Sequence, residues 1–210
     1  MAAGSRQFAA HVPERDGATD IAALLRQVRA CRACAKTLPH VPRPVVQLSA
    51  EARLVIIGQA PGSRVHASGI AWDDDSGARL REWIGLDGDT FYDPTRVAMM
   101  PMGFCYPGKG AGADLPPRPE CAPLWHDRLL AHLPKRRLTL LVGLHAQRRY
   151  LAGGRAQSMT DAVRQFRTYL PDYLPLPHPS WRSTLWMRRN PWFAEDVLPA
   201  LRAAVRDALH

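Results

Sequence analysis

Four short apolar runs, separated by longer segments of helical periodicity, dominate the pattern of this chain. Each run is rich in leucine, isoleucine, valine or methionine, and glycine or histidine follows it within two residues; the runs are 53–57, 97–102, 138–142 and 173–176. Continuous apolar runs of this length are typical of strands buried on both faces of a parallel sheet.

Apolar residues recur at helical spacing over 21–33, 78–84, 122–133 and 194–209, and a further helix begins at residue 146. Strands that alternate with helices predict an α/β fold, here a three-layer αβα arrangement around a central, mainly parallel four-stranded sheet. In such sheets ligands bind beyond the carboxyl ends of the strands.

Two segments interrupt this alternation. Residues 38–47 and 106–119 are rich in proline and glycine, which predicts loops. A loop as long as 106–119 inside a compact domain is commonly either functional or disordered. We expect a flexible N-terminal tail over residues 1–20, ahead of a single domain over residues 21–210.

The composition narrows the possible partners. The chain has 210 residues, of which 46% are hydrophobic and 22% charged, and its formal net charge is +9. This excess of positive charge favours polyanionic partners such as nucleic acid. No apolar run reaches the roughly 18 residues of a membrane span, and no secretory signal begins the chain, so we expect a cytoplasmic protein without membrane association.

The four cysteines of the chain have a spacing typical of a metal site. Cys31 and Cys34 form a C-x2-C pair, and Cys105 and Cys121 follow with fifteen residues between them. A C-x2-C pair brings two thiolates to one metal centre, and two distant cysteines can complete a four-sulfur shell around zinc or an iron–sulfur cluster. The alternative is a redox C-x-x-C pair with two buried thiols that act as small hydrophobes.

Two groups of residues after the first predicted strand could carry chemistry. Residues 58–62, Gly-Gln-Ala-Pro-Gly, predict a tight turn whose amides face a ligand, or which has only a structural role. Trp72 then precedes three adjacent acids at 73–75. Asp75 or Ser76 could cap the helix that starts near Gly77, or one carboxylate could position a water while Trp72 stacks on a planar ligand.

A third group follows the last predicted strand, at residues 178–184. A histidine held by the proline after it can polarise a ligand, and the hydroxyls and arginine behind it can bind phosphate. In this segment and just after it, basic and aromatic residues are interleaved, as suits nucleic-acid binding; they are Trp181, Arg182, Trp186, Arg188, Arg189 and Trp192. The alternatives are a histidine satisfied within the core and a charged surface helix anchored by tryptophan.

Together these pieces resemble the uracil-DNA glycosylase superfamily, and most closely its iron–sulfur branch, known as family 4, with its bacterial relatives. That branch has the C-x2-C and C-x15-C cysteine pairs, a Gly-Glu-Ala-Pro-Gly turn, an aromatic residue thirteen positions after the turn's acid, and a His-Pro-Ser motif. This chain has the same cysteine spacing, Gln59 in the turn, Trp72 thirteen positions later, and His178-Pro179-Ser180. The resemblance extends from about Ile21 to the C-terminus.

The resemblance implies a monofunctional DNA glycosylase of base excision repair, monomeric and associated with the bacterial nucleoid. It would bind DNA that contains uracil or another damaged base, flip the nucleotide out, hydrolyse the N-glycosidic bond and leave an abasic site. The four cysteines would bind a [4Fe-4S] cluster rather than zinc. The base would contact Gln59, Ala60 and Trp72.

Further roles are implied residue by residue. His178 would donate to the base as it leaves, Ser180 would bind a phosphate, and Arg182 would fill the gap left by the flipped base. Further phosphate contacts would come from Lys109, Arg188 and Arg189.

The chain departs from the family at three places. The turn of the family is followed by an acid, whereas this chain has Ser-Arg-Val-His at 63–66, so the water-positioning group is expected to be Asp73 or Asp74, with His66 as the rival. The family reads uracil with an asparagine four residues before the third cysteine, where this chain has Pro101. Trp181 also stands where many relatives have proline. These differences favour a pocket that reads its base through backbone groups or accepts a wider range of modified bases.

Two other classes of function fit the same residues. A non-catalytic iron–sulfur protein could bind damaged or abasic DNA without releasing a base. A redox protein could use the cluster for electron transfer, in which case its activity would follow the oxidation state of the cluster.

Overall fold

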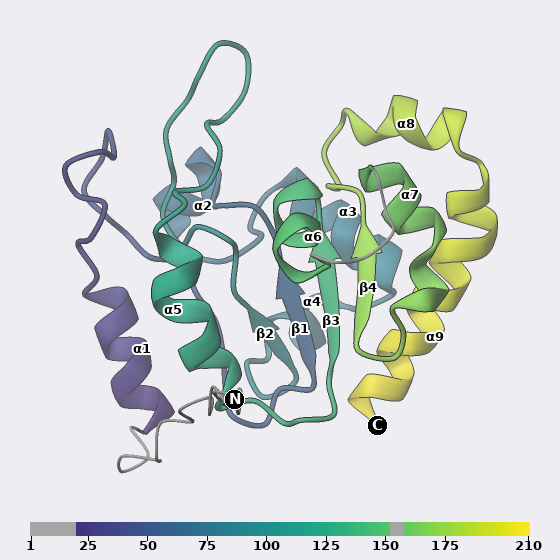
Figure 1. Ribbon diagram of the computed structural model, residues 1–210, viewed down its shortest axis with the longest axis horizontal. Helices are drawn as coiled ribbons and strands as arrows, with labels where there is room; N and C mark the ends of the chain where they lie inside the picture. Colours follow the sequence, from purple (N-terminus) through teal and green to yellow (C-terminus); the bar gives the residue numbers. More distant parts are fainter. Residues whose placement is uncertain (1–19, 152–157) are drawn as a thin grey trace, which may run out of the picture.

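The computed structural model describes residues 20–151 and 158–210 (Figure 1). Its strands are β1 (Leu54–Ile57), β2 (Val97–Met99), β3 (Leu138–Val142) and β4 (Tyr173–Leu176), in the spatial order β2-β1-β3-β4 with every neighbouring pair parallel. The predicted α/β fold with a four-stranded sheet is therefore confirmed, and the sheet is parallel throughout. The tail expected over residues 1–20 lies outside the described residues, except for Asp20, which caps the first helix.

Alternate residues of each strand enter two separate hydrophobic cores. In β1, Leu54 and Ile56 belong to one core and Val55 and Ile57 to the other, and none of the four is exposed. The first core is covered mainly by α3 (Asp75–Ile84), α7 (Met159–Arg164) and α9 (Leu198–Leu209), and the second by α1 (Ile21–Arg29), α5 (Cys121–Leu130) and α6 (Leu144–Tyr150). Figure 1 shows α1 and α5 on one side of the sheet and α9 on the other, which makes the three predicted layers.

Several short helices escape prediction from the sequence. They are α2 (Ser63–Ser68), α4 (Gly88–Tyr92) and α7, with a 3-10 turn at Phe166–Thr168. The segment after β4 does form a surface helix, α8 (Ser183–Arg189), and the helix predicted over 194–209 begins with a π-helical stretch at Phe193–Val197. In α2 only Val65 is buried, and in α4 only Phe91. One buried residue gives no periodicity, so helices this short leave no hydrophobic pattern to read.

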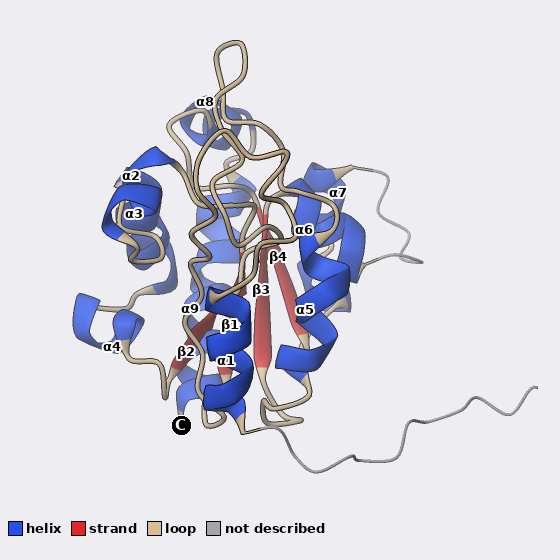
Figure 2. Cartoon of the chain, turned by 90° about the vertical axis from the view of Figure 1, so that its left-hand side faces the viewer, coloured by secondary structure: helices blue, strands red, loops and turns tan. Residues whose placement is uncertain are grey.

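The carboxyl ends of all four strands meet at one edge of the sheet. The turn after β1 is bonded to the chain after β2, because Met102 N donates to Gly58 O at 2.9 Å and Gly103 N donates to Gln59 O at 3.0 Å. Figure 2 shows loops gathered above this edge, and Figure 1 shows the long loop at 106–119 and α8 rising there. In the described part of the chain no helix is both long and apolar enough to span a bilayer.

A buried histidine fixes α5 against this edge. His126 is fully buried; its Nδ1 lies 2.6 Å from the hydroxyl of Tyr150 and its Nε2 lies 3.0 Å from the carbonyl oxygen of Pro101. Its ring stacks on Phe104 with 5.6 Å between the ring centroids. Burial lowers the pKa of His126 to about 4, so the ring is neutral in the folded protein near pH 7.

This histidine should make the fold sensitive to acid. The unfolded chain binds a proton at about pH 6.5, whereas folded His126 binds it only near its pKa of about 4. The free energy of unfolding should therefore fall as the pH drops through this window, by up to about 3 kcal/mol.

We expect His126→Phe to be less stable at neutral pH, because Tyr150 and Pro101 lose a partner, and to lose less further stability between pH 6.5 and 4 than wild type. Urea unfolding at several pH values measures both effects. If His126→Phe loses as much stability as wild type between pH 6.5 and 4, groups other than His126 are responsible for the acid sensitivity.

Candidate active site

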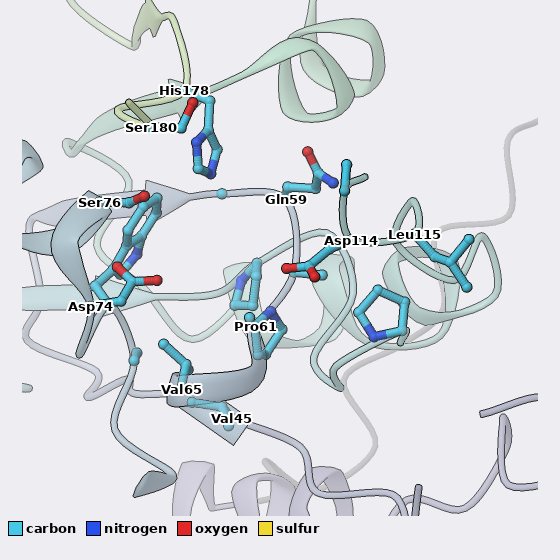
Figure 3. A pocket seen from close by; sticks show the side chains of 18 of the residues that line it. Val45, Gln59, Pro61, Val65, Asp74, Ser76, Asp114, Leu115, His178 and Ser180 are labelled. Carbon is cyan, nitrogen blue, oxygen red and sulfur yellow. The ribbon is translucent and has the colours of Figure 1, made fainter. Parts of the chain in front are cut away.

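A cavity of about 390 Å³ opens at the carboxyl edge of the sheet (Figure 3). Most of its lining comes from four segments, namely the turn after β1, residues 71–76, the loop at 106–119 and the loop after β4; Val45, Val65 and Pro101 complete it. Pockets of about 300–1,000 Å³ are typical of small-molecule sites, so the volume suits a ligand the size of a nucleobase or nucleoside.

Trp72 is held in one position by glycines on two sides. A Cβ on Gly58 would lie 2.6 Å from Trp72 Cζ2, and a Cβ on Gly77 would lie 1.8 Å from the carbonyl oxygen of Trp72. Trp72 has a φ of 58°, in the left-handed region that is costly for a tryptophan. Tyr92 also donates to the Trp72 carbonyl at 3.3 Å. The indole ring is therefore packed against the backbone of the turn, with its remaining surface toward the cavity.

Asp74 is the acid of the Asp73–Asp75 run that lines the cavity. Its Oδ1 accepts a hydrogen bond from Gly77 N at 2.8 Å and so caps α3, while its Oδ2 lies on the side of Gly62. The expectation that Asp75 or Ser76 caps this helix is wrong. The Asp75 side chain is 98% exposed and pairs with Arg64 at 2.8 Å. Asp73 is not among the cavity-lining residues.

His178 enters the cavity from the end of β4. Ser183 Oγ donates to the His178 carbonyl, and the guanidinium of Arg79 donates to the Ser180 carbonyl at 2.6 Å, so the loop is tied to α8 and α3. The ring centroids of His178 and Trp72 are 5.9 Å apart. Burial lowers the pKa of His178, and the carboxylate of Asp74 opposes this shift only in part, so the imidazole is neutral near pH 7.

The sequence matches the uracil DNA glycosylase superfamily over residues 45–202, which is most of the chain and includes every cavity-lining residue. The chain belongs to this superfamily. Its members are generally hydrolases that cleave the N-glycosidic bond of uracil or a similar base in DNA. The match describes the superfamily as a whole and does not specify a branch.

The site residues predicted from the sequence fall into two groups, those that line the cavity and those that do not. Seven line the cavity: Gln59, Ala60, Trp72, Asp74, His178, Ser180 and Arg182. Others do not, namely Asp73, His66, Lys109, Arg188 and Arg189. Arg188 and Arg189 lie exposed in the last turn of α8, and Lys109 lies exposed in the 106–119 loop. Pro101 does line the cavity, so an apolar ring takes the place of the family's asparagine.

His66 lies on α2 in an aromatic group and is not among the residues that line the cavity. Its ring is 5.3 Å from that of His40 and 5.8 Å from that of Tyr106. Burial lowers the pKa of His66, and within the described residues its buried Nδ1 has no hydrogen-bond partner. This packing is what a structural role for the histidine requires, whereas a water-positioning role would require the ring to reach the cavity.

One cavity-lining acid carries no sequence motif. Asp114 is the only acid in the 106–119 loop, and its Oδ2 would lie 3.5 Å from a Cβ on Gly62. The loop is long and unusual in composition, but nothing in the sequence says that it folds back over the turn at 58–62. Arg182 donates to Gly112 O at 2.8 Å and so connects the loop to the His-Pro-Ser segment.

The four cysteines surround one small cavity of their own. Cys31 and Cys34 follow α1, Cys105 follows β2 and Cys121 begins α5, and all four line this cavity. Burial raises the pKa of Cys105 to about 11 and that of Cys121 to about 12, so a bound cation would have to displace their protons. Among the described residues no group of three or more Cys, His, Asp or Glu side chains is arranged to hold a metal ion.

The donor chemistry nevertheless suits an iron–sulfur cluster. Such clusters are held by four thiolates, and the cavity brings together four thiols. A cluster is larger than a single ion, so its thiolates stand farther apart than the ligands of zinc. Phe104 N already donates to Cys121 Sγ at 3.3 Å, and hydrogen bonds of this kind to the sulfur ligands tune a cluster.

The corrected helix cap can be tested by stability measurements. Asp74→Ala should lower the free energy of unfolding by about 1 kcal/mol, because Gly77 N loses its acceptor. Asp75→Ala should cost less than about 0.5 kcal/mol, because its ion pair is exposed. Asp74→Asn is the matched variant, since asparagine caps as well as aspartate. A larger cost for Asp75→Ala than for Asp74→Ala would contradict the assignment.

Proposed function

We propose that the protein is a monofunctional DNA glycosylase that removes uracil or a related deaminated base and leaves an abasic site. The observation that carries the proposal is the convergence of Trp72, Asp74 and His178 on one cavity. Trp72 and Asp74 come from one segment just before α3, whereas His178 follows β4 much later in the chain. The two segments meet because the parallel strands end at one edge of the sheet. A stacking surface, a carboxylate and a neutral donor are the three groups that this hydrolysis requires.

The reaction separates charge along the bond that breaks. The C1′–N bond breaks with its electron pair leaving on the base, which becomes an anion, while the sugar gains positive charge and the oxygen of a water bonds to C1′. Neutral His178 can donate a ring N–H to a carbonyl oxygen of the base, where negative charge develops. The carboxylate of Asp74 can stabilise the sugar, with Oδ1 held by the helix cap.

Base recognition rests on stacking and on backbone groups. Stacking on Trp72 contributes about 1–3 kcal/mol per base, which helps to offset extrusion from the duplex. Gln59 and Ala60 line the cavity from the turn, while Pro101 offers no side-chain amide to a uracil edge. A pocket of this kind would accept more than one deaminated base.

DNA would approach across the mouth of this cavity. Ser180 and Arg182 line it, and Lys109, Arg188 and Arg189 lie exposed on the loop and helix beside it. With a net charge of +9, phosphate contacts from this side would supply the sequence-independent part of binding. We propose Ser180 and the four basic residues as these contacts.

Base release decides between a glycosylase and a non-catalytic binding protein. We expect wild type to release base from at least one DNA in a panel carrying uracil, hypoxanthine or xanthine, as read by strand cleavage at the abasic site after alkali. In His178→Ala the single-turnover rate on that DNA should fall by about 10²–10³, the usual cost of one such donor. His132→Ala, outside the cavity, is the matched control.

Binding to abasic DNA with no release of any base would favour the non-catalytic alternative. Full activity in His178→Ala would show that the family's donor role does not carry over to this chain.

We further propose that Cys31, Cys34, Cys105 and Cys121 bind a [4Fe-4S] cluster with a structural role. The cluster would tie the end of α1 to the start of α5 and to the 106–119 loop. Metal binding that joins distant segments contributes directly to folding.

Protein purified without oxygen should be brown and contain iron and sulfide, and Cys105→Ser should be colourless and less soluble. Ala33→Ser is a matched control, because Ala33 lines the same cavity and the change leaves all four thiols in place. The measurement is the iron and sulfide content of wild type and of each variant. A Cys105→Ser protein that keeps its iron, or a wild type that binds only zinc, would contradict the proposal.

A further inference from the structure

The cavity has a second carboxylate, on the wall opposite Asp74. Figure 3 shows Asp74 and Asp114 pointing from opposite sides toward the space above Pro61. Both carboxylates lie near Gly62, since a Cβ there would be 3.5 Å from Asp114 Oδ2 and 3.9 Å from Asp74 Oδ2. Any sugar that enters beside Trp72 would therefore have an acid on each side.

Asp114 is presented by a small hairpin. Gly110 N donates to Ala113 O at 2.7 Å and Leu115 N donates to Gly108 O at 2.9 Å, which closes the turn. Arg182, which lies outside the hairpin in the segment after β4, donates to Gly112 O at 2.8 Å. These bonds use backbone atoms of the hairpin, so none of them needs a carboxylate at position 114.

The Asp114 side chain itself makes few contacts that would stabilise the fold. Its one side-chain hydrogen bond among the described residues comes from the hydroxyl of Tyr106, at a long 3.4 Å to Oδ1, and no ion pair is formed there with a described residue. Asp114 is exposed beside the proposed DNA surface, where a negative charge opposes phosphate binding. One long hydrogen bond is little structural reason to keep a negative charge that opposes phosphate binding, so a chemical role accounts better for Asp114.

We propose that Asp114 is a catalytic residue that accepts the proton of the attacking water. The assignment rests on the proposed glycosylase function. The water oxygen bonds to C1′ as the C1′–N bond breaks, the electron pair leaves on the base, and one water proton passes to the Asp114 carboxylate and then to solvent. Asp114 Oδ2 is free for this step, whereas Asp74 is partly engaged through its cap to Gly77. Asp74 then acts on the charge of the sugar.

Asp114→Asn separates this role from a role in binding. On the DNA that wild type cleaves best, the single-turnover rate of Asp114→Asn should fall about 10²-fold, the lower range for one positioned proton acceptor. Affinity for the abasic-site DNA should stay the same or increase, because a negative charge has been removed. Asp75→Asn, an equal charge change at an exposed site outside the cavity, should leave the rate unchanged.

A rate for Asp114→Asn within about tenfold of wild type would overturn the assignment. A loss of affinity in parallel with the loss of rate would also overturn it, because Asp114 would then be a binding residue. A wild type that releases no base from any DNA would instead defeat the proposed function, and this assignment with it. An active wild type with an equally active Asp114→Asn defeats the assignment alone.

Discussion

The close approach of Trp72 to Gly58 is the contact on which the rest of the site depends. There is no room for a side chain at Gly58, because the indole ring occupies the place of its Cβ at 2.6 Å. Gly58 directly follows β1, a fully buried strand in the middle of the sheet, so the ring is packed against the end of a central strand. Gly77 makes the same close approach to the Trp72 carbonyl and brings the start of α3, with Asp74, to the cavity. One packing arrangement therefore positions both the stacking surface and the acid.

A second dependence joins the cysteine cavity to the base cavity. Residues 101–105 serve both: Pro101 lines the base cavity, while Gly103, Phe104 and Cys105 line the cysteine cavity. His126 binds the Pro101 carbonyl from α5, the helix that begins at Cys121. A cluster that fixes Cys105 and Cys121 would also fix this wall of the base cavity. Loss of the cluster would then reduce base excision, even though the cluster itself takes no direct part in the chemistry.

The framework of the molecule could be predicted from the sequence, and the details of the site only in part. Strands such as 138–142 are predictable because a strand buried on both faces is almost entirely apolar, here with Thr139 as the one polar residue, and this pattern can be read without knowing what the strand packs against. The helix cap was predicted at Asp75 or Ser76 and lies at Asp74, because three adjacent acids give the same local signal and only the path of the chain separates them. Asp114 could not be predicted, because its importance comes from a hairpin folded over residues 58–62, a through-space contact without a motif.

The most direct test of this account is the single-turnover excision rate of Gly58→Ala. One added methyl group must displace the Trp72 ring, because its carbon would lie 2.6 Å from Cζ2, and a displacement of about 1 Å at a reacting centre can cost about 10²-fold in rate. Gly88→Ala, where nothing lies within 4 Å of the added carbon, is the matched control. We expect Gly58→Ala to fold and its excision rate to fall about 10²-fold, while Gly88→Ala matches wild type. A Gly58→Ala protein that excises the base at the wild-type rate would contradict it.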